Sequence, residues 1–265
     1  MSAYKDYGIL IRSSELEFDT ADAVLVSRPV GPHTGAEFVS VDIVRIPAGT
    51  RWDPAGYTGQ EVTAVVFTGK GTARIGTRTH TMEKGSTAYA PTGQPVSFTA
   101  DGEELTVYFW RGDLPDGAPR GTAPALFNTV HDTSAGIRDF AGTGEITPVG
   151  SEQRAYMNFP HWPGNGCAHL CVNTGVAAPG HTFNIHGHPG AEDALFALHG
   201  QGQFFLGDQW FDMSPGDGVF ARPGVLHGTR HPDGPDEHAR FISVGGPVPY
   251  DPTLYRSAGL SADVV

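Results

Sequence analysis

Short apolar stretches separated by Gly and Pro dominate the chain. In the first half they include TAVVFTG (63–69), TARIG (72–76) and STAYAP (86–91), and in the second half ALFALHG (194–200), GQFFLG (202–207) and DGVFAR (217–222). Runs of this length, bounded by turn residues, are typical of β-strands joined by tight turns. The pattern predicts an all-β protein.

The two halves repeat each other. A segment that begins at Gly49 aligns without a gap to one that begins at Gly180, at an offset of 131 residues. The matched pairs are Gly49/Gly180, Gly59/Gly190, Glu61/Glu192, Gly69/Gly200, Gly71/Gly202, Gly76/Gly207, Met82/Met213, Gly85/Gly216 and Gly93/Gly224. Coincident glycines indicate the same turns in two copies of one unit, against chance agreement in a Gly-rich chain.

Successive short hairpins favour a jelly roll or small barrel for each copy, because such architectures limit exposed sheet edges. Residues 113–150 are rich in Pro, Gly and Thr and are interpreted as the connection. We therefore predict domains at 1–120 and 121–265. Composition agrees, since 36 Gly and 21 Pro with only 17% charged residues favour short strands over long helices.

Charge restricts the partners. A formal net charge of −12 attracts neither nucleic acid nor an anionic membrane, so we expect a small-molecule substrate. A homodimer is the starting expectation for assembly. The N-terminus MSAYKDYGIL lacks the pattern of a signal peptide, and no long apolar run occurs, so a soluble, cytoplasmic protein is expected.

The stretch HGHPGAED (186–193) concentrates potential metal ligands. Residues two apart in a strand project to one face, so His186 and His188 can present both imidazoles to one point, with Asn184 on the same face. The following turn returns an acid, Glu192 or Asp193, and RPGVLHG adds His227. Three imidazoles and a carboxylate suit a divalent transition metal such as Fe, Mn, Ni, Zn or Cu, and leave coordination positions open for catalysis.

These motifs resemble those of the cupin superfamily. The resemblance rests on Gly180, His186, His188, an acid and Gly200, followed by Gly216, Asp217, Pro223, Gly224 and His227. It implies two tandem cupin barrels, a bicupin, with the metal inside the mouth of the second. The usual interval in the family selects Asp193 as the carboxylate ligand. The preference for Glu in the family, the match to Glu61 and the longer side chain favour Glu192, and the choice stays open.

The first copy lacks the ligands. Ala55, Tyr57, Val62 and Val96 stand at the positions of His186, His188, Asp193 and His227. We predict a barrel without metal and with a structural role, either against the second barrel or at a subunit interface. Binding of a ligand without metal is the alternative.

Several side chains are candidate substrate contacts. CAHLCVN (167–173) is interpreted as a strand with His169 and Asn173 on one polar face, which lines the pocket or else faces solvent. Asn184 shares the face of the histidines. Arg222, before the Pro-Gly turn, is placed at the barrel mouth, where it would meet an anionic substrate.

The resemblance implies an enzyme with His186, His188 and His227 as catalytic residues. This ligand set is similar to that of cupin dioxygenases, oxalate-decarboxylase-like enzymes and isomerases, so an Fe-dependent oxidoreductase of the dioxygenase type is expected first. The two-barrel layout also resembles the (S)-ureidoglycine aminohydrolase family, which differs in using Glu-x-His, a further His and a Gln. A redox-neutral hydrolase, isomerase or decarboxylase, or a non-catalytic binding bicupin, is the alternative.

Overall fold

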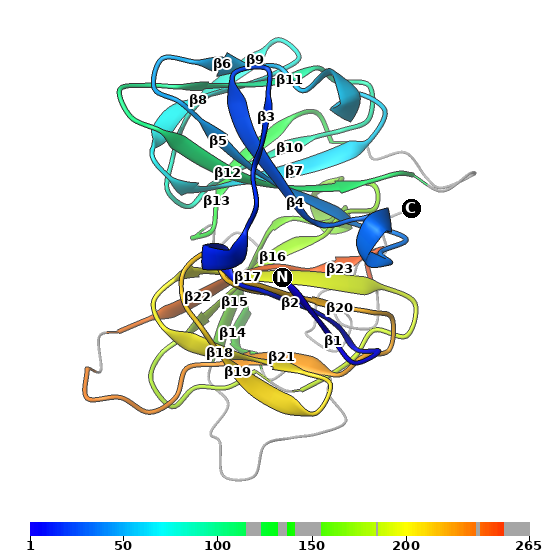
Figure 1. Cartoon of the computed structure of the whole chain (residues 1–265), viewed down its shortest axis with the longest axis vertical. Coiled ribbons are helices and arrows are strands. Elements are labelled where there is room, and N and C mark those ends of the chain that lie inside the picture. The colour runs from blue at the N-terminus through cyan, green and yellow to red at the C-terminus, as the bar shows by residue number, and fades with distance from the viewer. Residues whose placement is uncertain (115–122, 132–136, 141–154, 184, 237–238, 252–265) are drawn as a thin grey trace.

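The computed structural model describes residues 1–114, 123–131, 137–140, 155–183, 185–236 and 239–251. Over these residues the regular structure consists of strands and short 3-10 helices, with no α-helix. Two β-sheet bodies lie one above the other (Figure 1). The prediction of an all-β chain with two tandem barrels is confirmed. In the described part of the chain, no helix combines the length and apolar character needed to cross a membrane.

The first barrel is formed by a seven-stranded sheet, in the order β13-β10-β7-β12-β5-β4-β3, and a four-stranded sheet, in the order β6-β11-β8-β9. Its strands are β3 (Asp19–Ala21), β4 (Val24–Val30), β5 (Ser40–Ile46), β6 (Arg51–Trp52), β7 (Glu61–Thr68), β8 (Lys70–Ile75), β9 (Arg78–Glu83), β10 (Ser86–Ala90), β11 (Val96–Ala100), β12 (Leu105–Gly112) and β13 (Leu126–Thr129). The short helices η1 (Ser13–Glu15), η2 (Pro32–Thr34) and η3 (Ala55–Tyr57) lie in its connections.

The second barrel repeats this plan with a nine-stranded and a three-stranded sheet, the latter in the order β19-β18-β21. Its strands are β14 (Ile137–Phe140), β15 (Ala155–His161), β16 (Val172–Ala177), β17 (Glu192–His199), β18 (Gly202–Leu206), β19 (Gln209–Met213), β20 (Gly218–Ala221), β21 (His227–Arg230), β22 (Phe241–Gly245) and β23 (Pro247–Val248). The N-terminal β1 (Ser2–Tyr4) and β2 (Gly8–Ile11) join the same large sheet, and η4 (Pro163–Asn165) precedes β16.

The repeated glycines occupy equivalent turns. In five of the matched pairs both members have a positive φ, among them Gly69 at 83° and Gly200 at 75°. A Cβ atom on Gly69 would lie 2.1 Å from the carbonyl oxygen of Glu104, and one on Gly200 would lie 2.0 Å from that of Arg240. Only glycine tolerates both the conformation and the close approach, so these turns fix where each barrel reverses its chain.

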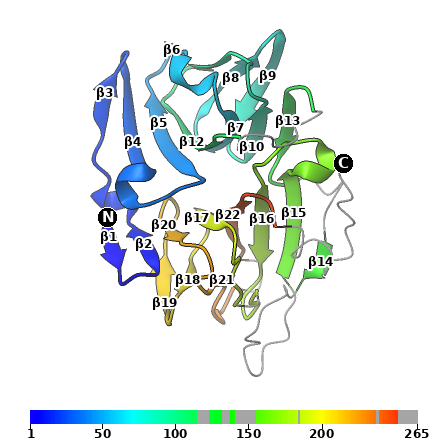
Figure 2. The ribbon, with the colours of Figure 1, turned by 90° about the vertical axis from the view of Figure 1, so that its right-hand side faces the viewer.

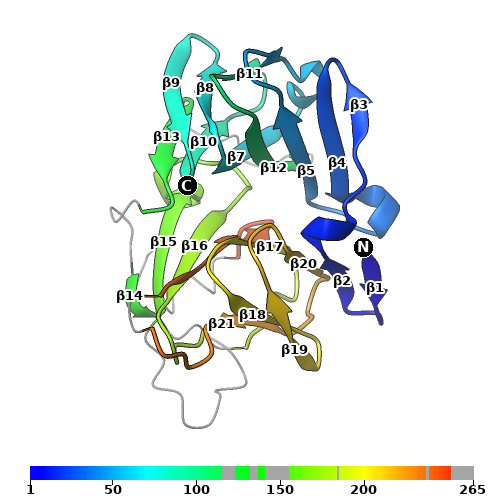
Figure 3. The same cartoon turned by 60° about the vertical axis from the view of Figure 1, so that its left-hand side comes forward.

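Each barrel receives a strand from beyond the expected boundary at residue 120. The N-terminal β2 pairs antiparallel with β20 of the second barrel, while β13 pairs with β10 of the first barrel. Figure 3 shows β1 and β2 beside β20, and Figure 2 shows β13 at the first barrel. Because β10 and β20 are equivalent strands of the repeat, the two exchanged strands occupy equivalent places. The large sheet of each barrel therefore includes a strand that the expected boundary assigns to the other domain.

The large sheets of the two barrels pack against each other. A continuous apolar cluster joins Val41, Val65 and Trp110 of the first barrel to Phe196 and Phe220 of the second. The Trp110 indole Nε1 also donates a hydrogen bond of 2.9 Å to the carbonyl oxygen of Ala194. Burial of this shared core holds the barrels as one unit, since buried apolar area is the main favourable term in folding.

Candidate metal centre

His186 and His227 lie opposite each other across an isolated antiparallel bridge. The backbone N–H of His186 donates to the His227 carbonyl at 2.9 Å, and the N–H of His227 donates to the His186 carbonyl at 2.7 Å. Facing residues of an antiparallel pair project to the same side, so both imidazoles enter the same space. His188 follows two residues later, outside the bridge, and turns its ring toward the other two.

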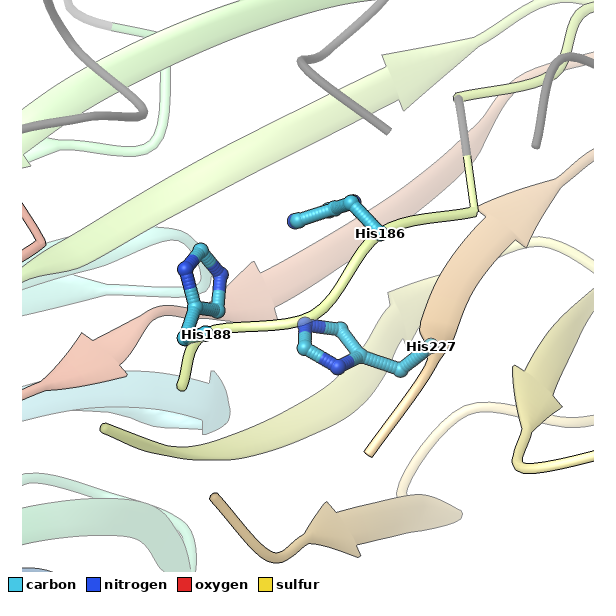
Figure 4. Close-up of side chains that lie close together, drawn as sticks. All are labelled: His186, His188 and His227. Carbon is cyan, nitrogen blue, oxygen red and sulfur yellow. The ribbon is translucent and has the colours of Figure 1, made fainter. Parts of the chain in front are cut away.

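The three imidazole rings converge (Figure 4). Their centroids are 4.7 to 5.2 Å apart, and one nitrogen from each ring lies within 4.8 Å of the others. The Asp193 carboxylate Oδ2 is 3.3 Å from His227 Nε2 and 3.8 Å from His188 Nε2. Ligands that share an ion at bonds of about 2.1 Å are separated by about 3.0 to 3.4 Å, so these side chains are spaced nearly as a coordination shell is.

The hydrogen bonds on the far side of two rings direct their lone pairs inward. His188 Nδ1 lies 2.8 Å from the Asp251 carboxylate, and His227 Nδ1 lies 2.9 Å from the Val225 carbonyl oxygen. Because both partners accept, each Nδ1 carries a proton, and in the neutral tautomer of each ring the lone pair lies on Nε2.

These two Nε2 atoms and Asp193 Oδ1 are buried and make no hydrogen bond within the described part of the chain. Two nitrogen lone pairs and a carboxylate therefore face one another at close range. Such an arrangement is unfavourable unless a positive charge lies between the groups. The three imidazoles form a group that could hold a divalent transition metal, and the Asp193 carboxylate lies beside them.

Glu192 lies next to Asp193 but faces the first barrel. Its carboxylate accepts hydrogen bonds from the backbone N–H groups of Glu37 at 2.7 Å, Phe38 at 2.8 Å and Val39 at 3.0 Å. Successive residues of a strand project to opposite faces, so only one of the two acids can point to the histidines. Of the acids that the sequence left open, Asp193 is the one at the site, and Glu192 joins the barrels.

Glu61, the repeat partner of Glu192, makes the equivalent contact in the opposite direction. It accepts hydrogen bonds from the N–H groups of Ala168, His169 and Leu170 in the second barrel, and from the Tyr89 hydroxyl. Burial raises the pKa of Glu61, although these four donors favour its ionised form. The match between Glu61 and Glu192, which had favoured Glu192 as a ligand, thus reflects a structural role shared by both copies.

The histidines line a small pocket. Its empty space is about 420 Å³ with the open mouth included, which is the scale of a small-molecule site. The walls combine neutral hydrogen-bonding and apolar side chains: Asn173, Thr229, Ser243, Met157, Phe183 and Leu195.

The candidate substrate contacts separate into three groups. Asn173 lines the pocket, as expected. His169 does not, because residues 167–171 precede β16 as an irregular segment and do not form the expected alternating strand. Arg222 lines a different pocket, with His33 and Gly35 of the first barrel, and is not at the mouth of the histidine pocket. Asn184 lies outside the described residues.

The matching region of the first barrel is filled. Tyr57, Val62 and Val96, which replace ligands of the second copy, belong to the apolar core of that barrel together with Trp52 and Phe109. The Tyr57 hydroxyl donates to the buried Asp42 carboxylate, and burial raises the pKa of Tyr57. The first barrel therefore lacks a matching metal group among the described residues, and aromatic rings occupy the space.

Asp251 was missed by the sequence analysis. It follows β23 in VPYD and comes to His188 only because β23 pairs with β17. No local pattern marks it. The role of Glu192 did carry a signal, since an acid present in both copies is poorly explained by a metal site present in one.

Comparison with known proteins supports the fold. A search of curated proteins finds no match. Among solved structures, the putative glyoxylate-induced protein from Pseudomonas aeruginosa has a TM-score of 0.73 at 17% identity, over 95% of this chain and 92% of that one. The protein Ylba from E. coli gives 0.65 at 18%, over 91% of each chain. A single-residue variant of the oxalate decarboxylase of Bacillus subtilis gives 0.59 at 12%, over 92% of this chain and 78% of that one.

The sequence match is confined to the second barrel. Residues 173–245 match the profile of the cupin domain family, a span that contains the three histidines and Asp193. This part of the second barrel therefore matches a cupin domain, and the whole chain shares its two-barrel fold with the solved structures above.

Proposed function

We propose that this bicupin is a metal-dependent enzyme that acts on a small organic molecule in its second barrel, with a dioxygenase-type oxidation as the first reaction to test. One observation carries the proposal: the inward lone pairs of His188 and His227 meet the Asp193 carboxylate in a pocket, without hydrogen-bond partners among the described residues. A structural or storage role requires no such convergence.

The residues of the chain divide the work. His186, His188 and His227 would hold the metal as neutral imidazoles, and Asp193 would offset part of its charge. A bound divalent transition metal supplies Lewis acidity and open coordination positions, and with Fe also redox chemistry with O2. Asn173, Thr229 and Ser243 would orient the polar groups of the substrate, while the apolar walls of the pocket limit the entry of water.

The size of the pocket limits the substrate. An empty space of about 420 Å³ fits a small molecule, and the neutral polar side chains of its wall suit a substrate with hydroxyl, carbonyl or carboxylate groups. Carboxylate and carbonyl oxygens are also donors that suit Mn.

Redox-neutral chemistry is the second candidate. The structural similarity to oxalate decarboxylase, together with the same overall layout, favours it. The two candidates differ in the need for O2 as a consumed reactant, which separates them experimentally.

The first test is the metal content of the full-length chain purified without chelator. We expect close to one transition-metal ion per chain, and its loss in His186→Ala and in His227→Ala with the fold retained by circular dichroism. Val96→Ala is the matched control, since Val96 holds the place of His227 in the first copy and should leave the metal content unchanged. Full metal occupancy in both histidine variants would refute the site.

The second test assigns the reaction class. Oxygen uptake by the metal-loaded protein, with a panel of small hydroxy, keto and carboxylic acids, should identify an oxidation. Release of CO2 or ammonia without oxygen uptake would favour the redox-neutral candidate. A metal-loaded protein that binds such compounds and converts none would favour a binding protein.

A further inference from the structure

The segment 247–251 at the end of the described chain lies directly behind the metal-ligand residues. β23 pairs antiparallel with the start of β17, with Val248 opposite Glu192 and Pro247 opposite Asp193. Two residues on, the backbone N–H of Tyr250 donates a 3.1 Å hydrogen bond to the His169 carbonyl oxygen. Pairing with β17 and the hydrogen bond to His169 thus fix the position of the backbone just before Asp251.

Asp251 then contacts one of the three histidines. Its carboxylate Oδ2 is 2.8 Å from Nδ1 of His188, across 63 residues of sequence. The His188 side chain is 2% exposed and that of Asp251 17% exposed, so the bond is well shielded from water. A charge-assisted hydrogen bond in such surroundings is stronger than a neutral one and has a defined direction.

We propose that Asp251 is a positioning residue of the metal centre, which fixes the ring orientation and the tautomer of His188 so that Nε2 faces the ion. The inference rests on the proposed function, because it takes His188 to be a ligand. A carboxylate behind a ligand imidazole also increases the basicity of the nitrogen that binds the metal.

His227 is held differently. Its Nδ1 uses the carbonyl oxygen of Val225, only two residues away in its own turn. The orientation of His227 is therefore a local property of the 225–227 segment, while that of His188 depends on a distant part of the chain. Because the carboxylate behind His188 comes from the segment after β23, changes in that segment should reach His188 selectively.

The experiment compares the full-length chain with Asp251→Asn and Asp251→Ala. The amide oxygen of Asn can still accept the proton of His188 Nδ1 but carries no charge, whereas Ala removes the acceptor. Asp208→Asn is the matched control, because Asp208 is an exposed carboxylate in the β18–β19 turn of the same barrel and pairs with Lys5. All four proteins carry the same tag and are stripped of metal before use.

Two quantities are measured. The first is the dissociation constant for Zn²⁺ and Mn²⁺, by competition with a chelator. We expect it to rise by about 10- to 100-fold in Asp251→Ala, by less in Asp251→Asn, and not at all in Asp208→Asn. The second is the tautomer of His188 in the metal-free protein, by long-range ¹H–¹⁵N correlation. The Nδ1–H form should dominate in the wild-type chain and give way to a mixture in Asp251→Ala.

The results separate the two ideas. Wild-type affinity and an unchanged tautomer in Asp251→Ala would overturn the positioning role. An equal loss of metal affinity in both Asp251 variants, together with a lower melting temperature of the metal-free protein, would also overturn it, because these results indicate loss of the fold. If the wild-type chain binds neither metal, the proposed function fails and the ligand role of His188 with it, even where the tautomer shifts as expected.

Discussion

Replacing Glu192 by Gln should weaken the contact between the barrels and leave the metal site intact. Glu192 is 1% exposed and accepts three backbone hydrogen bonds, one through Oε1 from Glu37 and two through Oε2 from Phe38 and Val39. Gln has the same shape but turns one oxygen into an NH2 donor. With the amide oxygen in the place of Oε2, the hydrogen bonds from Phe38 and Val39 remain. The amide NH2 group then faces the N–H of Glu37, so that two donors oppose each other.

The cost follows from these bonds. Loss of one hydrogen bond to a charged acceptor removes about 1.5 to 3 kcal/mol. The two that remain fall from charge-assisted to neutral strength, at about 0.5 to 1 kcal/mol each. Burying an amide costs less than burying a carboxylate, which offsets part of the loss. We expect a net decrease of about 2 to 4 kcal/mol in the free energy of unfolding.

The assay combines thermal unfolding with hydrogen exchange of the metal-free protein. A loss of that size lowers the melting temperature of a chain this long by about 5 to 12 °C. Exchange should accelerate most at the amides of Glu37, Phe38 and Val39, which lose their acceptor. Metal content should equal that of the wild-type chain.

Asp193→Asn is the counterpart. It removes charge next to His227 and His188 and should lower metal affinity while leaving exchange at 37–39 unchanged. Loss of metal from Glu192→Gln with unchanged exchange at 37–39 would refute this role, because Glu192 would then act at the histidines and not between the barrels.

Two further predictions concern stability. Burial lowers the pKa of His161 from 6.5 to about 3, so below pH 6.5 the unfolded chain gains a proton that the folded chain does not. Stability should therefore decrease as the pH is lowered below 6.5, by about 2 kcal/mol at pH 5. His161→Gln should remove this part of the difference in unfolding free energy between pH 7 and pH 5. Equal pH dependence in both proteins would contradict the prediction. Gly200→Ala should cost about 3 kcal/mol or more in chemical denaturation, because of its positive φ and the carbonyl of Arg240, whereas Gly190→Ala, with open space around it, should cost under about 1 kcal/mol; similar midpoints for the two variants would show that the turn can relax.

The pattern along the chain determined the architecture and three of the four candidate ligands. Alternation and turn residues are local properties, and a glycine that needs a positive φ, as Gly69 and Gly200 do, marks its turn wherever the rest of the chain lies. The spacing of His186 and His188 is likewise a local property, and it brings both rings to one side of the backbone. His227 followed from its turn and from the resemblance of the second copy to cupins.

Only the tertiary structure decided how the site and the barrels are completed. Glu192 and Asp193 are neighbours, and the choice between them depends on which face of β17 meets the histidines and which meets residues 37–39. The exchange of β2 and β13 and the approach of Asp251 to His188 join residues far apart in the chain. Strand pairing uses backbone groups that every residue carries, so no local sequence pattern identifies the distant strand with which a segment pairs.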